Sequence, residues 1–248
     1  MIIELTGCTG SGKSTLLHKI IARHQGQSLE VISAQTLIMH KLHLSWCAHE
    51  VGQRIVMTLV GLIWCLAGLR HHRTLLLFCY GFIRHLPDEI GLKERMKIAR
   101  IVARNIGLHR CIKYFDGPDY IVIVDEGTLH IAHYLFVYET LSPDLVQIER
   151  FISLVPIPDG GVFLQAAREQ LITRTLARGH GRVTSGSPQA VENFITHALA
   201  VSEYIRQCPD LRCKLVVVSS HDGTIRTDLS PSANSAEIYS VIKHLVNG

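Results

Sequence analysis

Residues 7–14 read Gly7-Cys8-Thr9-Gly10-Ser11-Gly12-Lys13-Ser14, between an apolar stretch at 2–5 and a helical pattern at 15–24. This is the pattern G-x-x-x-x-G-K-S/T in the strand–loop–helix context that a phosphate-binding loop requires. Glycines let backbone N–H groups turn inward around phosphate oxygens, and the N-terminus of the next helix adds partial positive charge. The sequence therefore predicts a nucleotide-binding site at the first strand.

The motif also predicts individual roles. Lys13 is expected to reach the β- and γ-phosphates, and Ser14 to ligate Mg²⁺. No N-K-x-D sequence follows, which argues against guanine and favours ATP. The expected nucleotide-binding residues in this region are Gly7, Thr9, Gly10, Ser11, Gly12, Lys13, Ser14 and Thr15.

A second run of interest is the apolar strand at residues 120–124, which is followed by Asp125 and Glu126. In phosphate-loop proteins a carboxylate at this point holds magnesium, usually through water, and Asp125 is the candidate. Glu126 could orient a nucleophile or accept its proton. The alternative is structural, because Asp125 or Thr128 could cap the helix that follows.

Strand patterns recur along the chain and are separated by helical patterns. The strands are expected at 2–5, 29–32, 120–124, 162–164 and 215–219, and the later helices at 129–140, 169–177, 188–207 and 236–246. Apolar, non-alternating strands separated by helices are typical of a parallel sheet covered on both faces. We therefore expect one α/β domain over residues 1–248, with a helical segment at 36–115 between the second and third strands.

Composition narrows the class of protein. Hydrophobic residues make up 47% and charged residues 19%, which excludes a disordered chain. Seven scattered cysteines without a C-x-x-C pair indicate reduced thiols in a cytoplasmic protein.

The N-terminal residues lead directly into a strand, so no signal peptide is expected. The apolar run at 55–69 is short for a membrane span, and a buried helix is expected there; contact with a membrane surface is the alternative.

Charge is concentrated in the middle of the chain. Residues 41–113 hold 12 Lys/Arg and 4 Asp/Glu, a net charge of 12 − 4 = +8 against +4 for the whole chain. Lys93, Lys97, Arg100 and Arg104 follow helical spacing, so this face is either simply solvated or binds an anionic partner. The modest net charge and the lack of interleaved aromatic residues argue against nucleic acid.

The sequence resembles the thymidylate-kinase-like branch of the nucleoside and nucleotide kinases. The likeness rests on the phosphate loop with Lys13-Ser14-Thr15, on the strand ending in Asp125, and on residues 162–179. In that last stretch Arg174, Arg178 and Gly179 fall in the register of the family pattern P-E-x-x-x-x-R-x-x-x-R-G. The resemblance covers residues 1–35 and the chain from residue 120 onward.

This resemblance implies a three-layer P-loop NTPase fold with strand order 2-3-1-4-5 and binding of ATP with Mg²⁺. It implies that residues 179–188 form a lid, with Arg174 and Arg178 stabilising charge on the transferring phosphate and Arg182 in reach of them. Asp222, after the last strand, would lie beside the adenine. The implied acceptor is a small molecule: a nucleotide, a nucleoside or a phosphorylated sugar.

Three positions depart from the family pattern. Thr9 stands where the family often has an acid, and Ser33-Ala34-Gln35 stand where an acid-proline-glycine segment is common. Glu126 replaces an arginine that helps to hold a monophosphate acceptor, which weakens the case for thymidylate.

The favoured hypothesis is an ATP- and Mg-dependent phosphotransferase that acts on a small anionic acceptor. Its catalytic residues would be Lys13, Asp125, Glu126, Arg174 and Arg178. The alternative is a nucleotide-dependent switch or accessory ATPase that binds a protein or membrane partner. His130 and His133, at i and i+3, could point into the acceptor site, but they lack a third ligand for a metal. The sequence leaves open whether the protein forms a homodimer.

Overall fold

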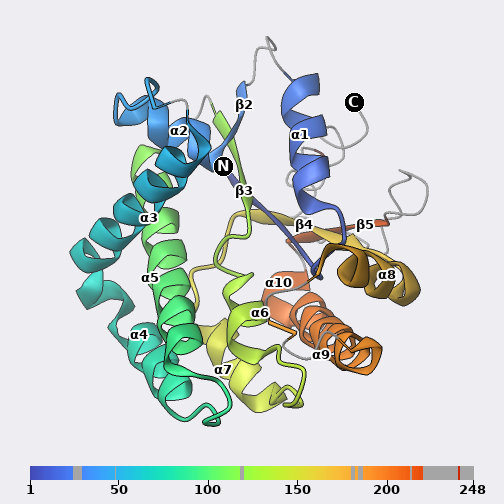
Figure 1. Cartoon of the computed structure of the whole chain (residues 1–248). Helices are drawn as coiled ribbons and strands as arrows, with labels where there is room; N and C mark the ends of the chain where they lie inside the picture. The colour runs from blue at the N-terminus through green and yellow to red at the C-terminus, as the bar shows by residue number, and fades with distance from the viewer. Residues whose placement is uncertain are drawn as a thin grey trace.

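A computed structural model describes residues 1–24, 30–47, 49–117, 120–179, 182–183, 187–212, 214–219 and 240. Within these residues a parallel sheet has the order β2-β3-β1-β4-β5 (Figure 1). Its strands are β1 (Ile2–Gly7), β2 (Glu30–Ser33), β3 (Tyr120–Asp125), β4 (Gly160–Gln165) and β5 (Leu215–Ser219). The α/β class and the strand order expected from the sequence are confirmed.

Helices connect the strands. They are α1 (Lys13–Arg23), α2 (Ala34–Lys41), α3 (Glu50–Ala67), α4 (Leu69–Arg84), α5 (Leu92–Phe115), α6 (Ile131–Phe136), α7 (Leu145–Leu154), α8 (Arg168–Arg178), α9 (Pro188–Gln207) and α10 (Pro209–Arg212). The insertion between β2 and β3 is helical, as expected. Helix α7 was not expected; Asp144 caps it by accepting bonds from Val146 and Gln147 N–H groups. The helix expected at 236–246 lies outside the described residues.

The sheet is covered on both faces because its strands are apolar on both faces. On β1, Ile3 and Leu5 pack with residues of α1, whereas Ile2 packs with residues of α2, α3 and α5. Figure 1 shows α1 on one side of the sheet and α5, α6 and α9 on the other. Because parallel strands share a direction, the carboxyl ends of β1 and β3 meet at one edge, beside α1 and α6.

Helix α3 is only half buried, which corrects the expectation of a buried helix at 55–69. Its inner side places Met57, Val60 and Cys65 against the protein, but Ile55 and Ile63 on its outer side are more than half exposed. A run of apolar residues in the sequence indicates that a helix is apolar, but it does not indicate how much of the helix surface is buried by other elements.

A close crossing holds α3 against α5. A Cβ added at Gly107 of α5 would overlap the carbonyl oxygen of Gly61 in α3 and lie 2.7 Å from the Cys65 nitrogen. A Cβ at Gly61 would lie 2.6 Å from the Arg104 carbonyl oxygen. Two helix backbones can come this close only where both lack side chains, so these glycines set the position of α3.

A buried carboxylate ties β1 to the turn after β3. Glu4 is 1% exposed and accepts hydrogen bonds from the Leu129 N–H (3.1 Å) and the His130 N–H (3.0 Å). The Thr128 hydroxyl lies 3.4 Å from the same carboxylate. Burial raises the pKa of Glu4 from 4.5 to about 7, because desolvation outweighs these donors.

The helix crossing generates a stability prediction. We expect Gly107→Ala to lower the free energy of unfolding by about 1–3 kcal/mol or more, because the added methyl group has no space. Gly81→Ala is the matched control: it also lies within a helix but has nothing within 4 Å of an added Cβ. This control should raise stability by about 0.5–1 kcal/mol. Urea unfolding followed by circular dichroism measures both; equal effects would contradict the crossing.

Glu4 generates a pH prediction. The folded chain binds this proton up to about pH 7, whereas the unfolded chain releases it near 4.5. Stability from this group should therefore fall as the pH rises from 4.5 to 7, by about 3 kcal/mol. Urea unfolding of the wild type and of Glu4→Gln at several pH values measures this effect. The difference between their free energies of unfolding should change between pH 4.5 and 7. A difference independent of pH would contradict the assignment.

Candidate active site

The loop between β1 and α1 adopts a conformation that its glycines make possible. Gly7, Gly10 and Gly12 have φ values of 133°, 82° and 101°, which are positive and unfavourable for residues with a side chain. A Cβ at Gly7 would also overlap the carbonyl oxygen of Leu164 in β4. Residues 7–15 thus surround a site at the N-terminus of α1, where N–H groups have no helical partner.

The ammonium group of Lys13 folds back over this loop. It donates to the carbonyl oxygens of Gly7 and Cys8, each at 3.2 Å, and the residue is 6% exposed. Both bonds are to neutral acceptors, so an anion beside the loop could replace them. Ser14 and Thr15 are exposed in the first turn of α1.

Ser14 and Asp125 meet across the two neighbouring strands. The Ser14 hydroxyl donates to Oδ2 of Asp125 at 2.8 Å. Oδ1 of the same carboxylate is buried and has no hydrogen-bond partner among the described residues. Burial raises the pKa of Asp125, and the Ser14 hydrogen bond opposes this shift. A hydroxyl and a carboxylate oxygen with a free lone pair are hard donors of the type that Mg²⁺ prefers.

Glu126 lies beside this pair in a strained conformation. Its φ of 57° is left-handed, which is uncommon for a residue other than glycine, asparagine or aspartate. Its carboxylate lies 3.4 Å from the Tyr134 hydroxyl and 3.4 Å from Nε2 of His130. The Asn105 amide donates to its carbonyl oxygen at 3.0 Å. These contacts hold the Glu126 carboxylate at the end of β3 while leaving it 44% exposed.

A cavity of about 560 Å³ opens beside Ser14, Asp125 and Glu126. Arg54 of α3 and Arg104 of α5 form part of its wall. Burial lowers the pKa of Arg104, and its guanidinium donates to the neighbouring Asn105 side chain at 3.2 Å. Within the described part of the chain, no carboxylate lies within ion-pair distance of Arg104. The cavity is therefore lined by the two carboxylates of Asp125 and Glu126 together with the half-buried Arg104 cation, which the Glu126 charge attracts.

The arginines predicted for a lid take different positions. Arg174 donates to the Gly10 carbonyl oxygen at 2.9 Å, which brings α8 to the phosphate loop. Arg178 is exposed in the last turn of α8. Arg182, expected in reach of them, instead lies 3.4 Å from Glu94 and donates to the His133 carbonyl oxygen. Asp222 and part of 179–188 lie outside the described residues.

The sequence had suggested that His130 and His133 could line the acceptor cavity. Both are instead buried beneath the phosphate loop. Their rings stack at 5.0 Å, and His133 is hydrogen-bonded to the Thr9 hydroxyl at 3.1 Å. Burial and the nearby charges of Lys13 and Arg182 hold the pKa of His130 well below its usual value. Sequence reasoning missed this support for the loop, since only their i, i+3 spacing hinted that they act together.

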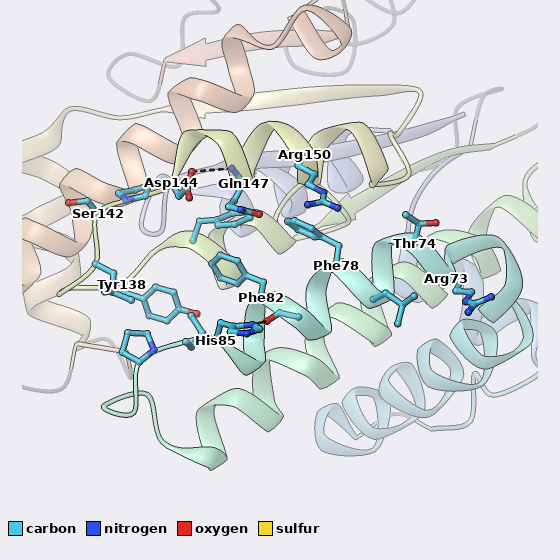
Figure 2. Close-up of a pocket in the computed structure, with 17 residues that line it drawn as sticks. Arg73, Thr74, Phe78, Phe82, His85, Tyr138, Ser142, Asp144, Gln147 and Arg150 are labelled. Carbon is cyan, nitrogen blue, oxygen red and sulfur yellow. Dashed lines mark hydrogen bonds between the residues drawn. The ribbon is translucent and has the colours of Figure 1, made fainter.

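A larger cavity, of about 1010 Å³, lies between α4 and the segment that joins α6 to α7 (Figure 2). Phe78, Phe82 and Tyr138 form its wall, and the Arg150 guanidinium lies over the Phe78 ring at 5.6 Å. It contains none of the site residues predicted from the sequence. Size alone therefore does not identify the active site of this fold.

Comparisons with known proteins bear on the fold of the chain. No protein-family model and no curated protein sequence matches the chain. Among solved structures, thymidylate kinase from Candida albicans is similar over 98% of this chain and 91% of its own, with 14% identity and a TM-score of 0.51.

Weaker likenesses exist to deoxyadenosine kinase from M. mycoides and shikimate kinase from Bacteroides thetaiotaomicron. The first has 15% identity, a TM-score of 0.45 and full coverage of both chains. The second has 13% identity and a TM-score of 0.39, covering 100% of this chain and 99% of its own. At these identities the thymidylate kinase likeness establishes the fold: the chain has the fold of a P-loop kinase.

Proposed function

We propose that this protein is an ATP- and Mg-dependent phosphotransferase that acts on a small anionic acceptor. The observation that carries the proposal is the pairing of Ser14 with Asp125 beside the phosphate loop. That pair keeps one buried carboxylate oxygen free and faces a cavity that also holds Glu126 and Arg104. The proposed nucleotide site and the proposed site of the phosphate acceptor would thus adjoin at Ser14 and Asp125.

The triphosphate would bind along the glycine loop. Backbone N–H groups at the N-terminus of α1 would surround the β-phosphate, and Lys13 would exchange its two carbonyl acceptors for phosphate oxygens. His133 supports the loop from below through the Thr9 hydroxyl. The neutral acceptors of Lys13 leave its full charge available to the phosphates.

Ser14 and Asp125 would hold magnesium, Ser14 directly and Asp125 through water. Bound there, the ion neutralises charge on the β- and γ-phosphates. Asp125 acts as a carboxylate, so its raised pKa means that metal binding should weaken in mild acid. The Ser14 hydrogen bond orients the carboxylate before any ion arrives.

Transfer would move the γ-phosphoryl group between oxygens. The bond from the γ-phosphorus to the bridging β-phosphate oxygen breaks, and a bond to the acceptor oxygen forms. Glu126 is placed to receive the acceptor's proton or to orient its hydroxyl. Arg174, already at the Gly10 carbonyl, and Arg178, one turn further along α8, would neutralise charge on the equatorial oxygens.

The cavity favours an acceptor with its own anionic group. Arg104 lines the cavity with a half-buried guanidinium that the Glu126 charge attracts from beyond ion-pair distance, so it would also attract an anionic group of the acceptor. Arg54 also lines this cavity, where its exposed side chain lies 3.7 Å from Glu50. A volume of about 560 Å³ lies in the range of small-molecule sites and suits a phosphorylated nucleoside or sugar.

A second candidate function is a nucleotide-dependent switch or ATPase that binds a partner. The exposed outer side of α3 favours it, because that surface could receive another molecule. Hydrolysis without transfer would support this candidate.

A metal prediction tests the Ser14–Asp125 pair. The wild type should bind ATP more tightly with Mg²⁺ than with EDTA, and Asp125→Asn should lose about 10- to 100-fold of that gain. Asp116→Asn is the control, since Asp116 pairs with the N-terminal amine at 2.9 Å rather than with the phosphate loop. Titration with a fluorescent ATP analogue measures all three. An unchanged Mg²⁺ effect in Asp125→Asn would contradict the assignment.

An acceptor prediction tests the proposed function itself. Purified protein with Mg-ATP should phosphorylate at least one member of a panel of nucleosides, nucleoside monophosphates and sugar phosphates. Arg104→Met should raise the KM for that acceptor by about 10- to 100-fold while changing the KM for ATP by less than about 2-fold. Lys93→Met, an exposed cation of the same helix, is the control and should change neither. Hydrolysis without transfer across the whole panel would refute the phosphotransferase.

A further inference from the structure

The cavity of about 1010 Å³ beside α4 has an aromatic wall that belongs to the hydrophobic core (Figure 2). Phe78 and Phe82, one turn apart on α4, line it together with Tyr138. Phe82 meets the buried ring of Phe136 edge to face, with the ring centroids 4.8 Å apart, and Phe136 contacts Phe151 in the same way at 5.9 Å. The packing of the core therefore fixes the shape of this wall.

Two arginines from different helices line the same cavity. Arg73 lies near the start of α4 and Arg150 lies in α7, and both residues are exposed. Among the described residues, neither has a carboxylate within ion-pair distance. The Arg150 guanidinium lies over the Phe78 ring, 5.6 Å from its centroid. Either arginine can therefore bind an anion without first losing a carboxylate partner.

Asp144 is the only acid among the described residues that line this cavity, and its carboxylate is already engaged. It caps α7 by accepting hydrogen bonds from the Val146 N–H at 3.0 Å and the Gln147 N–H at 3.2 Å. The partial positive charge at the start of α7 offsets its negative charge further. With His85 neutral, two arginines and one aspartate give the wall a formal charge of 2 − 1 = +1. The wall therefore favours an anion over a cation.

Volume and lining together indicate the class of ligand. A cavity of about 1010 Å³ is at the upper end of the range for small-molecule sites, which are mostly apolar with a few polar groups that orient the ligand. Aromatic side chains favour flat aromatic rings, which stack on them offset or edge to face. A guanidinium binds a carboxylate, sulfonate or phosphate group. An aromatic ring system that carries one such group would use both features of the wall.

We propose that this cavity is a second small-molecule site, which binds a planar aromatic anion. The rings lie against Phe78 and Phe82, and the anionic group lies at Arg150, with Arg73 adding attraction from the start of α4. The cavity contains none of the residues of the candidate active site, so the two sites are separate. This inference goes beyond the proposed function and does not rest on it, because binding of such an anion requires neither nucleotide nor metal.

Two fluorescent probes that differ by one charged group test the ligand class. Titration of the full chain without nucleotide should show saturable binding of 8-anilinonaphthalene-1-sulfonate. N-phenyl-1-naphthylamine, which has the same rings but no sulfonate, should bind about 10-fold more weakly. Arg150→Met should reduce this difference to less than about 3-fold, because the methionine keeps the apolar contact but not the charge. Lys93→Met, an exposed cation outside the cavity, is the control and should preserve the difference. Equal binding of both probes to the wild type would overturn the proposal.

Gly81→Leu tests the place of binding. Gly81 lines the cavity and has nothing within 4 Å of an added Cβ, so a leucine has room there and should remove saturable binding of the sulfonate probe. Gly91→Leu is the matched control: it also has nothing within 4 Å of its Cβ, but it lies before α5 and outside the cavity, so binding should be unchanged. Urea unfolding checks that both variants are folded.

Three results would overturn the site. Binding could survive Gly81→Leu, which would exclude the cavity. Binding could be lost in Leu59→Lys, which would place the probe on the exposed side of α3. Excess Mg-ATP could displace the probe, which would place it at the nucleotide site.

Discussion

The Ser14 hydroxyl and the Asp125 carboxylate meet at 2.8 Å, and the rest of the site depends on that contact. It can form only because β1 and β3 are neighbours in a parallel sheet, so that the residues following each strand meet at one edge. The glycines then let the intervening loop turn around an anion, and buried Glu4 fixes the turn after β3. Sheet topology, loop conformation and one buried carboxylate therefore act together to fix the arrangement in which the proposed function places a metal ion and a phosphate.

Much of the sheet could be predicted from the sequence, because its strands are apolar and the glycine loop is a local pattern. Both depend on residues close together in the chain. Helix α7 was missed, since its cap at Asp144 lies in a stretch without strong periodicity. The outer side of α3 was expected to be buried, because sequence reports hydrophobicity but not coverage. The contact of Arg182 with Glu94 could not be predicted for a related reason: the two residues lie 88 positions apart, beyond any local pattern.

In the candidate site too, local sequence patterns could be predicted, whereas contacts between distant residues could not. Residues 7–15 and Asp125 are local motifs, and the structure brings them to one edge of the sheet. The contacts of Arg104 and of the stacked histidines became visible only in three dimensions. Arg104 belongs to the basic face for which the sequence left solvation and anion binding open, and its partial burial at the cavity distinguishes it from exposed Lys93 on the same helix. The insertion between β2 and β3 thus supplies two features: arginines in the cavity wall on its inner side, and an exposed apolar side of α3 on its outer side.

Glu126 has a left-handed backbone at the end of β3, a conformation that glycine or asparagine would adopt at lower cost. Selection for a robust fold alone would favour one of those residues there. Under the proposed function, this glutamate would exchange some stability against heat for chemistry, as happens at many active sites. Attempts to make the protein more heat-tolerant should leave this position unchanged and seek their gains in the helical insertion, far from the end of the strand.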